Sequence, residues 1–130
     1  MKYILLMTGT RAGVDTYRAW NKNDIDTHIA GLKNLVERLR ESGEYIADQA
    51  LTGPEEAKVV RGQKKDMPIT DGIFPESKEF LLGYWIVDVS IPERAYAIAA
   101  QLSTMPGPGG VPTNMPIEVR QFASHPLKLS

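Results

Sequence analysis

Two side chains in this sequence, His28 and Asp71, have the chemistry that proton transfer requires. His28 falls in the first turn of a predicted helix, and its spacing of four residues from Leu32 places it on the apolar stripe of that helix. A neutral imidazole accepts a proton, as a general base must. The alternative is a histidine at the edge of the core whose ring is bound to a backbone carbonyl. Both interpretations stay open at the level of sequence.

Asp71 precedes Gly72 at the start of a charged stretch, residues 70–79. An aspartate before a glycine is typical of a tight turn, where its carboxylate accepts hydrogen bonds from nearby backbone N–H groups. The same carboxylate could orient the imidazole of His28 and hold one tautomer, as the acid beside a catalytic base does. The two roles are compatible with one another.

Three further residues are candidates for substrate contacts. Arg61, near the end of a predicted strand, and Arg120, on the last strand, could hold an anionic group. An exposed surface position is the alternative for Arg61, and a cross-dimer ion pair with Glu118 is the alternative for Arg120. Tyr84, near the start of an apolar strand, is the third candidate.

The composition is that of a globular protein and excludes several classes of site. The 130 residues are 42% hydrophobic and 24% charged, with 15 basic and 16 acidic side chains. This balance disfavours binding to nucleic acid. With no cysteine and two histidines, the chain is predicted to hold no metal and no cofactor. The apolar start is too short for a signal peptide, and no stretch suits a membrane span, so a cytoplasmic location is predicted.

The elements that would position these residues follow from hydrophobic periodicity. Apolar residues at helical spacing predict a helix that begins at Asn23 or Asp24 and ends at Gly43, and a second helix capped by Ser90. Residues 9–23, which include Tyr17 and Trp20, are interpreted as a loop whose aromatic side chains either pack beneath it or line a site. Strands are predicted at residues 3–8, 44–51, 57–61, 81–89 and 117–122, with the second and third paired as a hairpin.

This order, β-α-β-(β)-β-α-β, predicts an α+β fold of the ferredoxin-like type, with two helices on one face of an antiparallel sheet. Residues 1–123 form the single domain and residues 124–130 a C-terminal tail. In the strand at 81–89, alternation places Leu81 with Trp85 on one face, and Leu82 with Tyr84 on the other. Because apolar residues occupy both faces, the uncovered face predicts a homodimer formed through the sheet.

Four short segments resemble the DGPF family of the YCII-related group. They are Asp-Gly-Ile-Phe at 71–74, Glu-Ser-Lys-Glu at 76–79, Gly-Tyr at 83–84 and Ile-Glu-Val-Arg at 117–120, and they occur in the order that the family has. The apolar start of the chain is also similar. Ile73 stands where the family has proline, which loosens the predicted turn without removing the acidic residue.

The resemblance implies a dimeric α+β barrel of ferredoxin-like units and a site that contains a histidine and an aspartate. On this sequence these residues are His28 and Asp71. Some members of the group resemble lyases or dehalogenases that act on small ring compounds. The leading hypothesis is cofactor-free proton transfer, of the isomerase or lyase type, on a small ring compound in a pocket between the first helix and the sheet. The alternative is a non-catalytic module that binds a small molecule or a regulatory protein such as a sigma factor.

Overall fold

The computed structural model describes residues 1–62 and 78–125, and the backbone alone of residues 69–71. Motif residues 72–77 and the predicted tail beyond residue 125 lie outside the described part. The described α-helices are α1 (Arg11–Arg18), α2 (Lys22–Ser42) and α3 (Pro92–Ser103), and short 3₁₀ turns are η1 (Pro54–Glu56) and η2 (Pro108–Gly110). The strands are β1 (Lys2–Gly9), β2 (Tyr45–Ala50), β3 (Lys58–Val60), β4 (Ile69–Asp71), β5 (Phe80–Asp88) and β6 (Ile117–Gln121).

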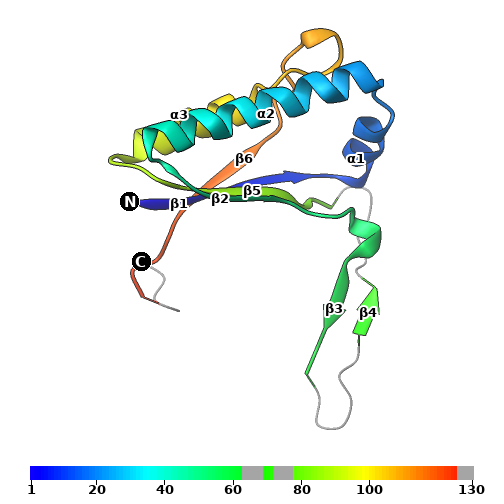
Figure 1. Cartoon of the computed structure of the whole chain (residues 1–130). Coiled ribbons are helices and arrows are strands. Elements are labelled where there is room, and N and C mark those ends of the chain that lie inside the picture. Colours follow the sequence, from blue (N-terminus) through cyan, green and yellow to red (C-terminus); the bar gives the residue numbers. More distant parts are fainter. Residues whose placement is uncertain (63–68, 72–77, 126–130) are drawn as a thin grey trace.

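The chain has a mixed α+β fold, as the sequence predicts. Four antiparallel strands form one sheet in the order β2-β5-β1-β6, and α2 and α3 lie on the same face of it (Figure 1). The core fills the space between these helices and the sheet. Burial of each apolar side chain there contributes about 1.5–3 kcal/mol. The largest fully buried side chains are Leu5, Leu35, Leu39, Val87, Ile98 and Leu102.

The ends of the two covering helices correct the predicted caps. The cap of α2 lies two to three residues earlier than predicted, at Asn21, whose side chain accepts a hydrogen bond of 2.8 Å from the backbone N–H of Asp24. Its predicted end is confirmed, since Gly43 adopts the left-handed conformation with φ of 79°. The predicted Ser90 cap is wrong: Ile91 occupies the cap position of α3, and no side chain caps it.

Residues 9–23 contain a helix, α1, where a loop is predicted. Thr10 caps α1 by accepting a hydrogen bond of 3.2 Å from the backbone N–H of Gly13. The eight residues of α1 include few apolar side chains, so its sequence is too short and too polar to show the repeating apolar positions that identify a longer helix. The prediction of exactly two helices is therefore wrong for the described chain, which has α1 in addition.

The predicted hairpin between residues 44–51 and 57–61 is also wrong. β2 pairs with β5, and β3 pairs instead with β4 in a separate two-stranded sheet, with Lys58 opposite Asp71. The turn η1 lies between β2 and β3 and redirects the chain there. The β3-β4 hairpin projects from the body on the side of the main sheet away from α2 and α3 (Figure 1). Asp71 is the last residue of β4, and the turn predicted to begin there falls on residues outside the described part.

The second face of the main sheet carries half-buried apolar side chains, among them Ile4, Leu6, Tyr84 and Ile86. We call these four residues the open face. No described helix lies over them (Figure 1).

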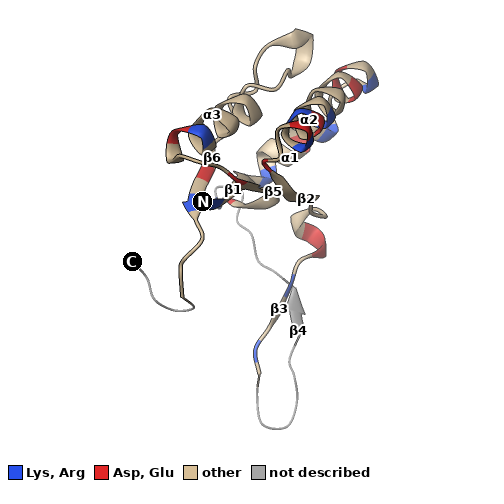
Figure 2. Cartoon of the chain, turned by 60° about the vertical axis from the view of Figure 1, so that its left-hand side comes forward, with Lys and Arg blue, Asp and Glu red and all other residues tan. Residues whose placement is uncertain are grey.

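The charged residues of α2 have both signs interspersed along the helix (Figure 2). Among the described helices, none combines the length and the apolar character needed to cross a membrane.

Candidate functional site

A cleft of about 990 Å³ lies between α1, α2 and the face of the sheet that the helices cover. Its volume is in the range of small-molecule sites. One wall is formed by apolar side chains of α2, Ile29, Leu32 and Val36. Ile29 on this wall is 38% exposed. The lining is mainly apolar, as it is in most ligand sites. The apolar side chains of the lining include Met7, Ile29, Leu32, Val36, Leu82 and Trp85.

A β-bulge shapes the floor of the cleft. The register between β1 and β5 shifts after Met7, so that Leu82 has no partner on β1. Leu82 consequently lines the cleft together with Trp85, whereas Leu81 is 37% exposed. The simple alternation predicted for this strand is therefore wrong at the bulge. Next to it, Gly83 allows β2 to approach closely, because an added Cβ would lie 2.9 Å from the carbonyl oxygen of Gln49.

His28 borders one end of this cleft and is only 7% exposed. Its Nδ1 lies 2.9 Å from the carbonyl oxygen of Pro106, in the loop that follows α3. A carbonyl only accepts hydrogen bonds, so Nδ1 carries the hydrogen and Nε2 of the neutral ring holds the lone pair. Nε2 has no hydrogen-bond partner among the described residues. The contact thus fixes the ring with its basic nitrogen unused.

The loop that supplies this carbonyl is itself held in place. Pro106 forms an isolated β-bridge with Pro112, and the backbone N–H of Thr113 donates to the Met105 carbonyl at 3.0 Å. Met105 is buried in the core. The Pro106 carbonyl is therefore a fixed acceptor.

Two aromatic side chains from the segment before α2 surround the imidazole. The His28 ring lies edge-on to Tyr17 and Trp20, with centroid separations of 6.0 and 5.5 Å, and these two rings are 4.9 Å apart. Both aromatic residues line the cleft. Of the two predicted alternatives for these residues, packing and lining a site, the structure shows both. Together with His28 they form what we call the aromatic end of the cleft.

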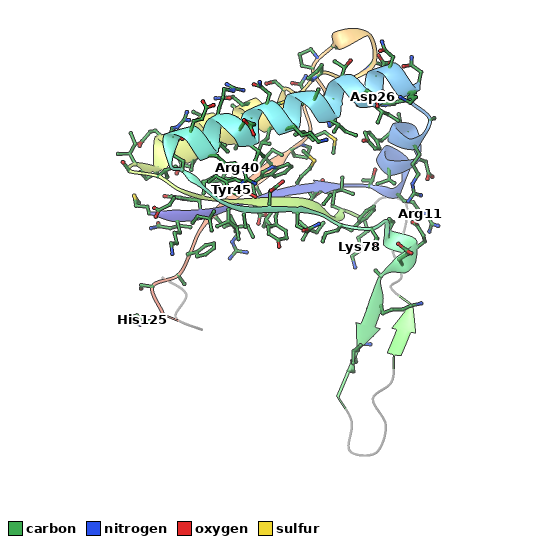
Figure 3. The ribbon with its side chains drawn as sticks, in the orientation of Figure 1. Arg11, Asp26, Arg40, Tyr45, Lys78 and His125 are labelled. Atoms are coloured by element: carbon green, nitrogen blue, oxygen red, sulfur yellow. The ribbon has the colours of Figure 1, made fainter. Side chains whose placement is uncertain are left out.

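The other end of the cleft is polar. The Arg40 guanidinium of α2 lies 4.3 Å from the centroid of the Tyr45 ring on β2, which is a cation–π contact. Figure 3 shows the two residues between α2 and the sheet. The Tyr45 hydroxyl donates to Asp48 Oδ1 at 2.5 Å, and this hydrogen bond raises the pKa of Tyr45. Arg40 and Asp48 line the cleft, and we call this the polar end.

The predicted site residues lie in three different places. His28 lines the cleft, whereas Tyr84 and Arg120 do not, because both belong to the side of the sheet away from the helices. Arg61 is exposed after β3, in the projecting hairpin. Asp71 ends β4 in the same hairpin, and its side chain lies outside the described part. Within the described residues of one chain, none of the other predicted residues lies beside His28.

Sequence reasoning missed Arg40, Asp48 and Trp85 as cleft residues. Arg40 offered a signal, since it stands four residues after Val36 on the apolar stripe, where a charge is unusual. The described residues contain no group of three or more acidic, histidine or cysteine side chains that could hold a metal ion. Neither a protein-family model nor a curated protein matches the sequence.

Proposed function

We propose that this chain binds a small, largely apolar molecule in the cleft between α2 and the sheet. The observation that carries the proposal is His28: a buried imidazole, fixed through Nδ1, whose Nε2 remains without a partner on the wall of a cleft of ligand size. A nitrogen lone pair on the wall of a cleft is available to a hydrogen-bond donor. A ligand donor would satisfy it here.

The aromatic end of the cleft favours a ligand that contains a ring. The side chains of Tyr17 and Trp20 offer aromatic faces and edges beside the imidazole. Offset or edge-on contacts between rings contribute about 0.5–1.5 kcal/mol beyond the area buried. This matches the small ring compound expected from the DGPF resemblance.

The second candidate function is cofactor-free proton transfer, of the isomerase or lyase type, with His28 as the base. Its support is the hydrogen bond to Pro106, which fixes the tautomer without any carboxylate. A proton taken from the ligand would move to Nε2, and the resulting imidazolium would keep its bond to the Pro106 carbonyl. In this mechanism Asp71 is not required to orient His28.

We further infer that the chain is a DGPF-type member of the YCII-related group with a ferredoxin-like fold, and that it forms a homodimer through the open face. The strand order β2-β5-β1-β6 with two helices on one face supports the fold. The half-buried apolar residues of the open face support the dimer. Light scattering at micromolar concentration should give a mass twice that of the single chain, which is 14.4 kDa. A monomer there would contradict the dimer.

Binding can be tested with a fragment library of monocyclic ketones and carboxylic acids, screened by saturation-transfer NMR. We expect several fragments to bind and to compete with one another. Tyr17→Ala should abolish their binding, whereas Tyr96→Ala, which removes an exposed tyrosine of α3 outside the cleft, should not. Equal effects of the two substitutions would contradict the proposed site.

Catalysis is tested separately, by incubating each bound ketone in D₂O and following deuterium incorporation next to the carbonyl. A base at His28 predicts exchange that His28→Asn abolishes. The matched control, His125→Asn, changes an exposed histidine near the C-terminus, which lies away from α2 (Figure 3). Binding without exchange in the unmodified chain would leave the binding function and remove the catalytic one.

A further inference from the structure

The cleft has a hydrogen-bond donor that nothing in the described structure satisfies. Trp85 is 7% exposed and lines the cleft, and its Nε1 is buried without a partner. An unsatisfied buried donor costs about as much as the hydrogen bond it fails to make, and native proteins contain few of them. Trp85 lines the cleft, so an acceptor from a ligand that seats against the indole is the simplest partner for this donor.

A cation, Arg40, also lines the cleft. Asp48 is the cross-strand neighbour of Trp85, Tyr45 donates to Asp48, and Arg40 covers the ring of Tyr45. Arg40, Tyr45 and Asp48 therefore form one connected group at the polar end, and Asp48 is paired with Trp85 of the neighbouring strand. Arg40 makes no ion pair with a carboxylate of the described residues, and Oδ1 of Asp48 already accepts the Tyr45 hydroxyl. The guanidinium therefore keeps donors for a ligand.

We propose that the polar end is a carboxylate subsite, in which Arg40 and Trp85 Nε1 bind a carboxylate group of the ligand. The inference rests on the proposed binding function and names its ligand class: an elongated molecule with a ring at one end and a carboxylate at the other. Arg40 stands twelve residues after His28 on α2, about 18 Å at 1.5 Å per residue. The ring occupies the aromatic end, and the chain between lies along the apolar wall.

The charges around the subsite define the competing ligand class. Lys33 and Glu37 of α2 also line the cleft, as does Asp48, so both signs are present. An amine would pair with Glu37 and Asp48, whereas a carboxylate would pair with Arg40 and Lys33. The unsatisfied Trp85 N–H decides between them, since it can donate to a carboxylate but has nothing to accept from an amine.

Three probes of one shape test the inference: ω-phenyloctanoate, ω-phenyloctanamide and ω-phenyloctylamine. Their affinities for the full chain are measured by NMR titration at neutral pH. We expect the carboxylate to bind about tenfold more tightly than the amide, as one charge-assisted hydrogen bond predicts. The carboxylate should also move the indole N–H resonance of Trp85 downfield more than that of Trp20.

Arg40→Gln should abolish the preference for the carboxylate over the amide. The matched control is Arg38→Gln, which changes an exposed arginine of the same helix that is bonded to Asn34 and does not line the cleft. Equal affinities for carboxylate and amide, tighter binding of the amine, or a preference that survives Arg40→Gln would overturn the carboxylate subsite while leaving the binding function in place. Failure of all three probes to bind would overturn both.

Discussion

Replacing His28 separates the structural contribution of its hydrogen bond from that of its ring contacts. His28→Ala removes the donor to Pro106, leaving a partly buried carbonyl without a partner, at a cost of about 1.5 kcal/mol. It also removes edge-on contacts with two aromatic rings, worth about 0.5–1 kcal/mol each. The expected loss in the free energy of unfolding is about 3 kcal/mol.

His28→Asn should cost only about half as much, because the asparagine amide nitrogen stands at the same branch position as Nδ1 and can donate to the Pro106 carbonyl. Urea unfolding followed by circular dichroism measures both losses. With an m-value of about 2 kcal/mol/M, the midpoints should fall by about 1.5 M for alanine and 0.7 M for asparagine. His125→Ala, at an exposed position, should stay within about 0.5 kcal/mol of the unmodified chain. Equal losses for His28→Ala and His28→Asn would refute the reasoning.

Two further predictions concern the framework around the cleft. Glu44 accepts two hydrogen bonds of 2.9 Å from Arg94, and these lower the pKa of its carboxyl group below the ordinary 4.5. The pair therefore stabilises the fold above pH 4.5, and this stabilisation is lost as the pH falls through the lowered pKa. Glu44→Gln should cost about 1 kcal/mol at pH 7 in thermal unfolding, since the pair is partly exposed, and a cost that persists unchanged at pH 3 would contradict the ion pair. Gly83→Ala should destabilise the fold by about 2 kcal/mol, because the added Cβ would press on the carbonyl oxygen of Gln49. The control, Gly62→Ala, places its Cβ in open space and should change the stability by less than about 0.5 kcal/mol. Equal effects of the two substitutions would refute the close approach of β2 at Gly83.

The sequence predicted those parts of the fold that depend on strong local patterns. The apolar strands β1 and β5 and the helix α2, with Gly43 at its end, follow from periodicity and cap chemistry. Helix α1 could not be recognised, because eight mostly polar residues are too few to show repeating apolar positions. The bulge that turns Leu82 into the cleft arises from the pairing of two strands, which alternation within one strand does not contain.

The candidate site was predictable only in part, for the same reason. The helical spacing placed His28 on the apolar stripe of its helix, and the pocket beside it was part of the hypothesis built on the DGPF resemblance. Its hydrogen-bond partner, Pro106, is 78 residues away in the sequence, in a Pro/Gly-rich loop without periodicity. The polar end requires the register of β2 on β5, which places Asp48 opposite Trp85. Such contacts depend on tertiary structure and leave no local signal.

The most direct test of the central claim, that the cleft binds a small molecule, is amide chemical-shift mapping with ω-phenyloctanoate. The largest changes should fall on cleft residues such as Gly83 and Trp85. Ile29→Trp should weaken binding at least tenfold by filling the cleft, whereas Leu81→Trp, at a position of nearly equal exposure outside the cleft, should not. Changes centred on the open face, or equal effects of the two tryptophan substitutions, would contradict the account.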